Sequence, residues 1–204
     1  MNKIFVLVCF IFIYGIQADR YTSSIKKWTF TIENDTRQYS ADIPSTLSLD
    51  LIDNGVISDP YYRDNFLQYY NYETKDVSYK TQFNVPSTVL SSNHQYLIFE
   101  GLDTHAEVFL NGDLILSSHN MFRRYEVEVL FKASNTLVVN FTSAVKHDLL
   151  KEAEFKEAYQ FSLPQNYSFS RKAAYQYGWD WGPRVLTVGI WKDVNILIYN
   201  YTRI

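Results

Sequence analysis

Alternation of apolar and polar residues in several short segments most constrains how this chain can fold. In residues 77–85 every second position is apolar or favours strands, and these positions are Val77, Tyr79, Thr81, Phe83 and Val85. Successive strand side chains point to opposite faces, so this pattern predicts a strand with one buried face. The same alternation predicts further strands at residues 124–129 and 135–142. Their expected core residues are Tyr125, Val127, Val129, Leu137, Val139 and Phe141.

An Asn-Gly pair marks the clearest turn in the sequence. Asn111 and Gly112 separate two apolar segments, residues 107–110 and 114–116. Both residue types tolerate the positive φ angles of a type I′ turn, so the segments are expected to form a β-hairpin. Further strands are expected at residues 28–32, 96–100 and 194–199.

Only two segments favour helices. One covers about residues 46–54, with Ser45 as the expected N-cap and Gly55 just past its end. The other covers roughly residues 144–159. Many short strands with few helices predict an all-β, two-sheet sandwich with one or two short peripheral helices. The 17% aromatic content, which includes 17 Tyr and 14 Phe, also favours strands.

Length and charge limit the classes of function. A chain of 204 residues fits one domain of ordinary size. Its 19 basic and 22 acidic residues give a net charge of −3, which lacks the basic surface expected for binding nucleic acid or an anionic membrane. No nucleic-acid or membrane partner is therefore expected.

The first 18 residues have the pattern of a secretory signal peptide. Lys3 precedes an apolar run that reaches Tyr14, and Ala18 is the expected cleavage position. The single cysteine, Cys9, lies inside this segment, so the mature chain, residues 19–204, is expected to contain no disulfide. Four N-glycosylation sequons agree with a lumenal or extracellular protein, and they begin at Asn34, Asn140, Asn166 and Asn200.

No cofactor or metal site is expected. The four histidines lack metal-ligand spacing and are expected to be surface or turn residues; they are His94, His105, His119 and His147. A retaining glycosidase would need two carboxylates about 5–5.5 Å apart. Nothing in the sequence pairs the available acids across one bond, namely Asp103, Glu107, Asp180 and Asp193.

Seven motifs in order resemble the amino-terminal domain of the β-mannosidases of glycoside hydrolase family 2. They are residues 59–65 (DPYYRDN), 99–104 (FEGLDT), 108–112 (VFLNG), 120–123 (NMFR), 171–172 (RK), 178–183 (GWDWGP) and 189–192 (GIWK). The resemblance covers nearly all of the mature chain. It implies a jelly-roll, galactose-binding-like β-sandwich, which agrees with the fold expected from the strand pattern.

The resemblance also implies an activity for the complete enzyme. Members remove terminal non-reducing β-D-mannose from oligosaccharides, in lysosomes or outside the cell. Their two catalytic glutamates lie on a later (β/α)₈ barrel. This sequence ends at Ile204, directly after the sandwich should close. We therefore expect the barrel to be absent and the chain alone to hydrolyse nothing, with the mannose-terminated oligosaccharide and the barrel as its partners.

The segment Trp179-Asp180-Trp181 is the candidate substrate-binding site. An indole can cover the apolar face of a sugar, and a carboxylate can accept hydrogen bonds from neighbouring hydroxyls. The resemblance implies that this triplet holds the terminal mannose. Against it, tryptophans at alternate strand positions are often core residues, and an Asp near Gly-Pro often forms a turn. Arg171 and Lys172 are expected to be a solvated basic pair.

Two other classes of function remain open. The chain could be a free-standing secreted carbohydrate-binding module, which keeps the sugar contacts without any chemistry. It could also be a non-catalytic sandwich used for protein contacts, in which the tryptophans are purely structural.

Overall fold

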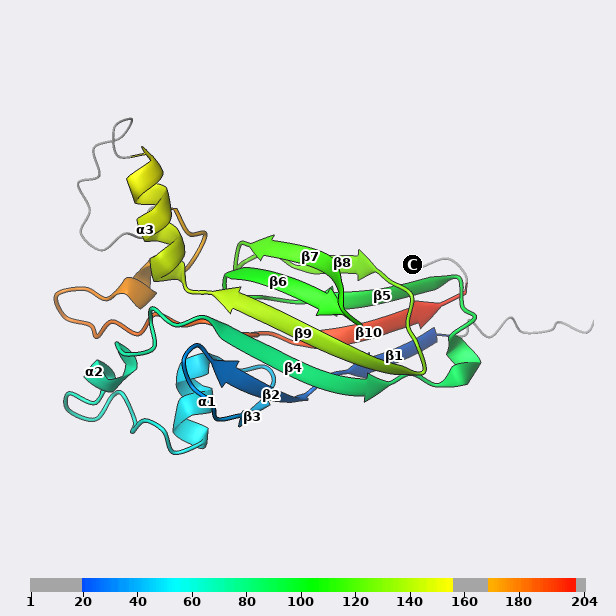
Figure 1. The fold of residues 1–204 in the computed structure, drawn as a ribbon, viewed down its shortest axis with the longest axis horizontal. Helices are drawn as coiled ribbons and strands as arrows, with labels where there is room; N and C mark the ends of the chain where they lie inside the picture. Colours follow the sequence, from blue (N-terminus) through cyan, green and yellow to red (C-terminus); the bar gives the residue numbers. More distant parts are fainter. Residues whose placement is uncertain (1–19, 156–168, 201–204) are drawn as a thin grey trace, which may run out of the picture.

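Two antiparallel sheets form a sandwich in the computed structural model, which describes residues 20–155 and 169–200 (Figure 1). The four-stranded sheet has the order β1 (Arg20–Ser24), β10 (Val194–Tyr199), β5 (His94–Phe99) and β8 (Tyr125–Glu128). The six-stranded sheet has the order β3 (Tyr39–Asp42), β2 (Lys27–Ile32), β4 (Val77–Asn84), β9 (Ser134–Thr142), β6 (His105–Leu110) and β7 (Asp113–His119). The predicted all-β sandwich is confirmed.

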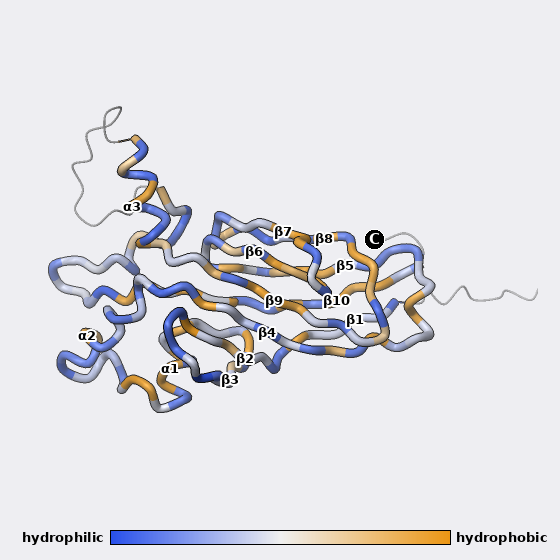
Figure 2. The backbone as a smooth tube through the Cα atoms, viewed as in Figure 1, coloured by the Kyte–Doolittle hydropathy of each residue, from blue (hydrophilic) through white to orange (hydrophobic). Residues whose placement is uncertain are grey.

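The core lies between the sheets and is filled as the alternation predicts. Strands β4 and β9 are neighbours in the six-stranded sheet, with Tyr79 opposite Val139. Both side chains are fully shielded from solvent. Phe30 of β2 stacks on Tyr79 with 5.4 Å between the ring centroids. Apolar and polar residues alternate along the strands (Figure 2), so each sheet turns one face inward.

The Asn-Gly hairpin is also confirmed. Strands β6 and β7 pair on either side of Asn111 and Gly112, whose φ angles are 54° and 97°. A register shift opposite Val108 and Phe109 leaves Ile115 of β7 as the extra residue of a bulge. The Asn111 side chain accepts a hydrogen bond from the Thr136 amide at 2.9 Å, which fixes the turn against β9.

The helices fit the predictions with one correction. Helix α1 (Leu47–Asp53) is followed by Gly55 at a φ of 67°, as expected for a residue just past a helix end. Its N-cap is Thr46, so the assignment of Ser45 was wrong. The Ser45 hydroxyl instead donates to the Thr46 carbonyl at 3.3 Å, and the Ser45 amide donates to Ile190. Helix α3 covers Ala144–Phe155, and its predicted extension to residue 159 lies outside the described residues.

The sequence pattern did not predict five short elements. They are β1, β3, helix α2 (Phe66–Tyr69) and the 3₁₀ helices η1 (Ser87–Val89) and η2 (Ala174–Tyr177). Strands β1 and β3 lie at sheet edges, so neighbouring strands hold them without an apolar signal of their own. No helix in the described ranges has the length and apolar character needed to cross a membrane.

Candidate functional site

The segment of residues 178–183 forms a small hairpin that projects from the end of the sandwich near α2 and α3 (Figure 1). The Trp179 amide donates to the Gly182 carbonyl at 3.2 Å, and the Gly182 amide donates to the Trp179 carbonyl at 3.1 Å. Asp180 and Trp181 therefore occupy the tip. Asp180 is a turn residue, as its sequence context suggested.

Both tryptophans are surface residues. Trp179 is 63% exposed and Trp181 is 84% exposed, and the Asp180 side chain is exposed as well. The two indoles lie 5.7 Å apart between centroids, tilted by 54°. A core role for these tryptophans is excluded by this exposure, and both rings have surface available to a ligand.

A glycine at the base of the hairpin fixes its direction. Gly178 has a φ of 82°, in the left-handed region that favours glycine. A Cβ at this position would lie 3.1 Å from the backbone N and Cα of Arg184. At Gly178 the two hairpin arms therefore approach each other more closely than a Cβ ordinarily permits.

Contacts of the segment that follows the hairpin tie it to the sandwich. The Arg184 Nε donates to the two carboxylate oxygens of Glu73 at 3.0 and 2.8 Å. Burial raises the pKa of Glu73, and the Arg184 charge opposes this shift. The hydroxyl of Tyr69, which is fully buried at the end of α2, donates to the Leu186 carbonyl at 2.9 Å. The exposed tip is thus carried on a buried and well-bonded base.

Lys172 is buried, which corrects the expectation of a solvated basic pair. Its ammonium donates to both oxygens of Asp103, at 2.5 and 2.6 Å, and to the Thr187 carbonyl. Burial lowers the pKa of Lys172, and Asp103 opposes that shift. Arg171 is exposed as expected. The sequence did not indicate that Lys172 is buried, because its partner Asp103 lies 69 positions earlier in the chain.

The structure brings together three potential metal-ligand groups that the sequence spacing did not indicate. His105, His147 and Asp148 offer ligand atoms within 4.8 Å of one another. His105 lies half-buried in β6 and is not the surface residue expected from the sequence. Burial, followed by the positive charges of its neighbours, lowers the pKa of His105 to about 4. His94 is half-buried, and His119 is exposed.

Three of the four sequon asparagines lie within the described residues. Asn34 is exposed in a turn with a φ of 63°. Asn140 is exposed on β9 and accepts a hydrogen bond from Ser78 at 2.7 Å. Asn200 is half-buried and accepts a hydrogen bond from the Asn93 amide at 3.1 Å. Asn166 lies outside the described residues.

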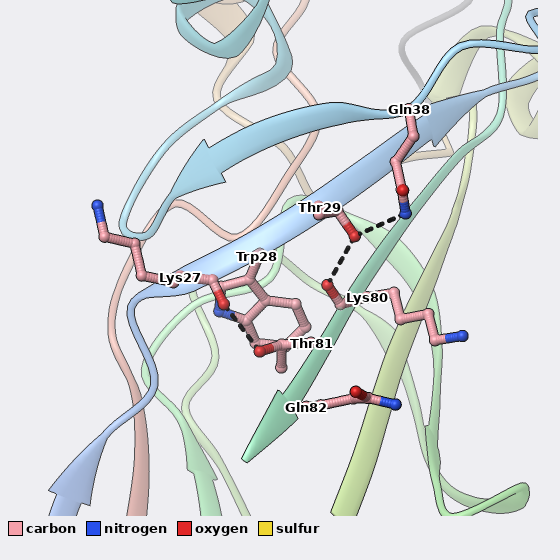
Figure 3. A pocket seen from close by; sticks show the side chains of 7 residues that line it. All are labelled: Lys27, Trp28, Thr29, Gln38, Lys80, Thr81 and Gln82. Atoms are coloured by element: carbon pink, nitrogen blue, oxygen red, sulfur yellow. Dashed lines mark hydrogen bonds between the residues drawn. The ribbon is translucent and has the colours of Figure 1, made fainter.

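A hollow on β2 and β4 of the six-stranded sheet has a volume of about 380 Å³ (Figure 3). Its lining is mainly polar: Lys27, Thr29, Gln38, Lys80, Thr81 and Gln82, together with Trp28. Trp28 is only 3% exposed, and its indole N–H donates to the Ile25 carbonyl at 3.1 Å. The hollow therefore has no aromatic face for a sugar, unlike the 178–183 hairpin.

Comparison with known proteins agrees with the fold and with the resemblance in the motifs. The family of glycosyl hydrolase 2 galactose-binding domain-like sequences matches residues 28–192. Beta-mannosidase of Rattus norvegicus is 34% identical over 186 residues, which covers 85% of this chain and 21% of the relative. Beta-mannosidase B of Emericella nidulans is 35% identical over 164 residues, covering 78% and 19%.

Two solved structures are also similar to this chain. The beta-D-mannosidase of Dictyoglomus thermophilum superposes with a TM-score of 0.81 at 34% identity, covering 86% of this chain and 22% of that one. The exo-chitosanase CsxA of Amycolatopsis orientalis, at 18% identity and a TM-score of 0.63, shares the fold. The chain spans about a fifth of the length of these mannosidases. It belongs to the glycosyl hydrolase 2 galactose-binding domain-like family, as the homologue of the N-terminal domain of β-mannosidases.

Proposed function

We propose that this chain is the substrate-binding N-terminal domain of a β-mannosidase that removes terminal non-reducing β-D-mannose from oligosaccharides. The exposed Trp179-Asp180-Trp181 tip carries the proposal, because it presents two aromatic faces and a carboxylate on a rigid base. The similarity to β-mannosidases of animals, fungi and bacteria supports mannose as the sugar.

Each residue of the tip has a chemical role in this proposal. The ionised Asp180 accepts hydrogen bonds from adjacent sugar hydroxyls, which a charged acceptor strengthens. Trp179 and Trp181 cover the C–H faces and exclude water from those bonds. Because the tip is convex and exposed, it buries only part of a monosaccharide. We therefore expect weak affinity for the chain by itself.

Bond cleavage is assigned to a separate catalytic barrel. Two of the acidic candidates considered in the sequence are already committed to ion pairs. Asp103 is fully buried against Lys172, and Asp193 pairs with Lys26. Because Asp103 is fully buried, it also has no surface that a sugar could reach. The barrel is proposed to dock at the hairpin end and to complete the pocket around Asp180.

The decisive experiment is a titration of the purified chain with methyl β-D-mannopyranoside, followed by NMR. We expect millimolar binding with shifts centred on residues 178–183 and loss of at least about tenfold in affinity for Asp180→Ala. Asp113→Ala, at the exposed β6–β7 turn, is the matched control and should bind as the unaltered chain does. Equal binding by Asp180→Ala, or no binding at saturating sugar, would contradict the proposal.

A free-standing carbohydrate-binding module is the second candidate, because the tip lies wholly within this chain. Addition of a β-mannosidase barrel to the chain distinguishes the enzyme domain from the free-standing module. Docking that tightens mannoside binding supports the enzyme domain, whereas unchanged binding supports the module. Hydrolysis of a chromogenic β-mannoside by the chain alone, above the Asp180→Ala level, would overturn both. A protein-contact sandwich would bind neither sugar nor barrel through the tip.

We also propose that the chain enters the secretory pathway, for a lysosomal or extracellular location. The pattern of residues 1–18 and the exposed sequons at Asn34 and Asn140 support this route. Expression in animal cells should give secreted material whose mass falls on treatment with an N-glycosidase. The Asn34→Gln substitution should remove the part of this fall in mass that comes from one glycan. Unglycosylated chain retained in the cytosol would contradict the proposal.

A further inference from the structure

A polar cluster lies where α3 and the segment before η2 meet the six-stranded sheet. His105 comes from the start of β6, while His147 and Asp148 come from the first turns of α3. Ser170 precedes Lys172 in the segment that leads to the hairpin. The imidazole rings of His105 and His147 stack with 3.6 Å between centroids and an interplanar angle of 21°.

Hydrogen bonds define which ring nitrogens carry protons. The Ser170 hydroxyl donates to Asp148 Oδ1 at 2.6 Å, so His105 Nε2–H is the donor to Ser170 Oγ at 2.8 Å. His147 Nδ1–H donates to the same Asp148 oxygen at 2.8 Å. In neutral imidazoles the remaining nitrogens, Nδ1 of His105 and Nε2 of His147, hold lone pairs. Within the described ranges neither lone pair accepts a hydrogen bond.

The charge of the cluster favours a cation. The Asp148 side chain is fully buried, and among the described residues His147 is its only ion-pair partner. The nearby Lys172 ammonium is already paired with Asp103 through both carboxylate oxygens. The Asp148 carboxylate therefore has no lysine or arginine partner among the described residues, and a cation bound in the cluster would compensate its burial.

We propose that His105, His147 and Asp148 form a binding site for one divalent transition-metal ion, with Zn²⁺ as the best match. Their ligand atoms already lie within 4.8 Å of one another. Two imidazoles and one carboxylate are a ligand set that Zn²⁺ accepts, with a fourth position left for water. Mg²⁺ and Ca²⁺ prefer sets made of oxygen alone. The His147 side chain is 26% exposed, which gives the ion a route from solvent and lets the ring tilt toward it.

Ion binding would link three parts of the fold. Where the ion binds Nδ1 of His147, the proton on that nitrogen leaves and Nε2 takes one up, so the neutral imidazole changes tautomer and no net proton is released. Ser170 keeps its contacts with two of the ligand groups and so orients them. The ion would join β6, α3 and the segment that leads to the sugar-binding tip. The site is independent of whether the tip binds mannose.

Calorimetric titration of the full chain, stripped of metal with a chelator, tests the site with Zn²⁺ as the probe. We expect one Zn²⁺ per chain, and Mg²⁺ at the same concentration should not compete. His147→Gln should weaken Zn²⁺ binding at least about tenfold. His94→Gln, which alters a half-buried histidine on the other sheet, is the matched control and should leave binding unchanged.

A second measurement uses the unaltered chain, so a folding defect in a variant cannot obscure the answer. Zn²⁺ should shift the imidazole NMR signals of His105 and His147 together and leave those of His94 in place. Co²⁺ should give the visible absorption of a four- or five-coordinate site. No saturable binding by the folded chain, or equal binding by His147→Gln, would overturn the proposal. The cluster would then be a hydrogen-bonded network that holds α3 without an ion.

Discussion

Lys172 and Asp103 form an ion pair in which both side chains are completely shielded from solvent. The two residues are 69 positions apart, and their contact joins the segment that leads to the 178–183 hairpin to the loop after β5. Thr187 donates to the same carboxylate at 2.6 Å, so the segment that follows the hairpin is attached as well. The pair therefore holds both arms of the hairpin at one buried point.

Removal of one partner should be strongly destabilising. Lys172→Met leaves Asp103 buried and without its counter-ion, and such a loss costs about 3–5 kcal/mol. Urea unfolding followed by tryptophan fluorescence measures the free energy of unfolding. Arg171→Met, at the exposed neighbour, is the control and should stay within about 0.5 kcal/mol of the unaltered chain. The double variant Lys172→Met/Asp103→Leu should recover part of the loss. A single variant as stable as its control would contradict this account.

Two glycines of the hairpin should differ in their tolerance of alanine. Gly178→Ala places a Cβ about 3 Å from Arg184 at a positive φ, so we expect a loss of more than about 1 kcal/mol. Gly182→Ala meets nothing within 4 Å and should be nearly neutral. Thermal unfolding of both variants provides the measurement. An equal loss of stability in Gly178→Ala and Gly182→Ala would show that the close approach of Gly178 to Arg184 does not constrain the hairpin.

Asp50 should make stability depend on pH in an unusual direction. Burial raises the pKa of this α1 carboxyl to about 6, although the Ser45 and Tyr79 hydroxyls oppose the shift. The folded state therefore holds the proton more tightly than the unfolded state, whose pKa is about 3.8. The resulting stability is complete below pH 3.8 and is lost as the pH rises through 6. The Asp50→Asn substitution removes this loss of stability at higher pH, because the amide does not ionise.

The difference in unfolding free energy between Asp50→Asn and the unaltered chain should accordingly grow with pH. From about pH 4 to pH 7 we expect an increase of no more than about 3 kcal/mol in favour of the variant. Chemical denaturation across that range measures it. Asp53→Asn changes an exposed carboxyl on the same helix and should give a flat difference. A flat difference for Asp50→Asn as well would show that Asp50 ionises normally in the fold.

Strands with one buried face could be predicted because their signal is local. Tyr79, Val139 and Phe141 lie in the core, where the period-two pattern places them. Strand β3 could not be found in this way, because its short sequence YSAD carries little apolar signal and β2 holds it at the edge. Ser45 failed as an N-cap for a similar reason, since its amide is engaged by Ile190, which is far away in the sequence.

The residues of the candidate site also differ in whether a local sequence pattern could predict them. The tip residues could be proposed because they lie within one short motif that resembles the β-mannosidase motif. The ion pair of Lys172 and the cluster of His105 with His147 depend on contacts between distant segments. No spacing rule connects such residues, so only the folded arrangement reveals them.

Truncation of the tip should separate binding from stability. Trp181 is 84% exposed, so Trp181→Ala removes little buried surface and should change the free energy of unfolding by less than about 0.5 kcal/mol. The same substitution removes one face of the proposed sugar contact, and mannoside binding should fall several-fold. Urea unfolding and the NMR titration, run on one sample, test both parts. As a control, Leu137→Ala in the buried face of β9 should lose about 2–5 kcal/mol. A loss of stability for Trp181→Ala close to that of Leu137→Ala would mean that the indole packs as a structural residue, and its assignment to the ligand would fail.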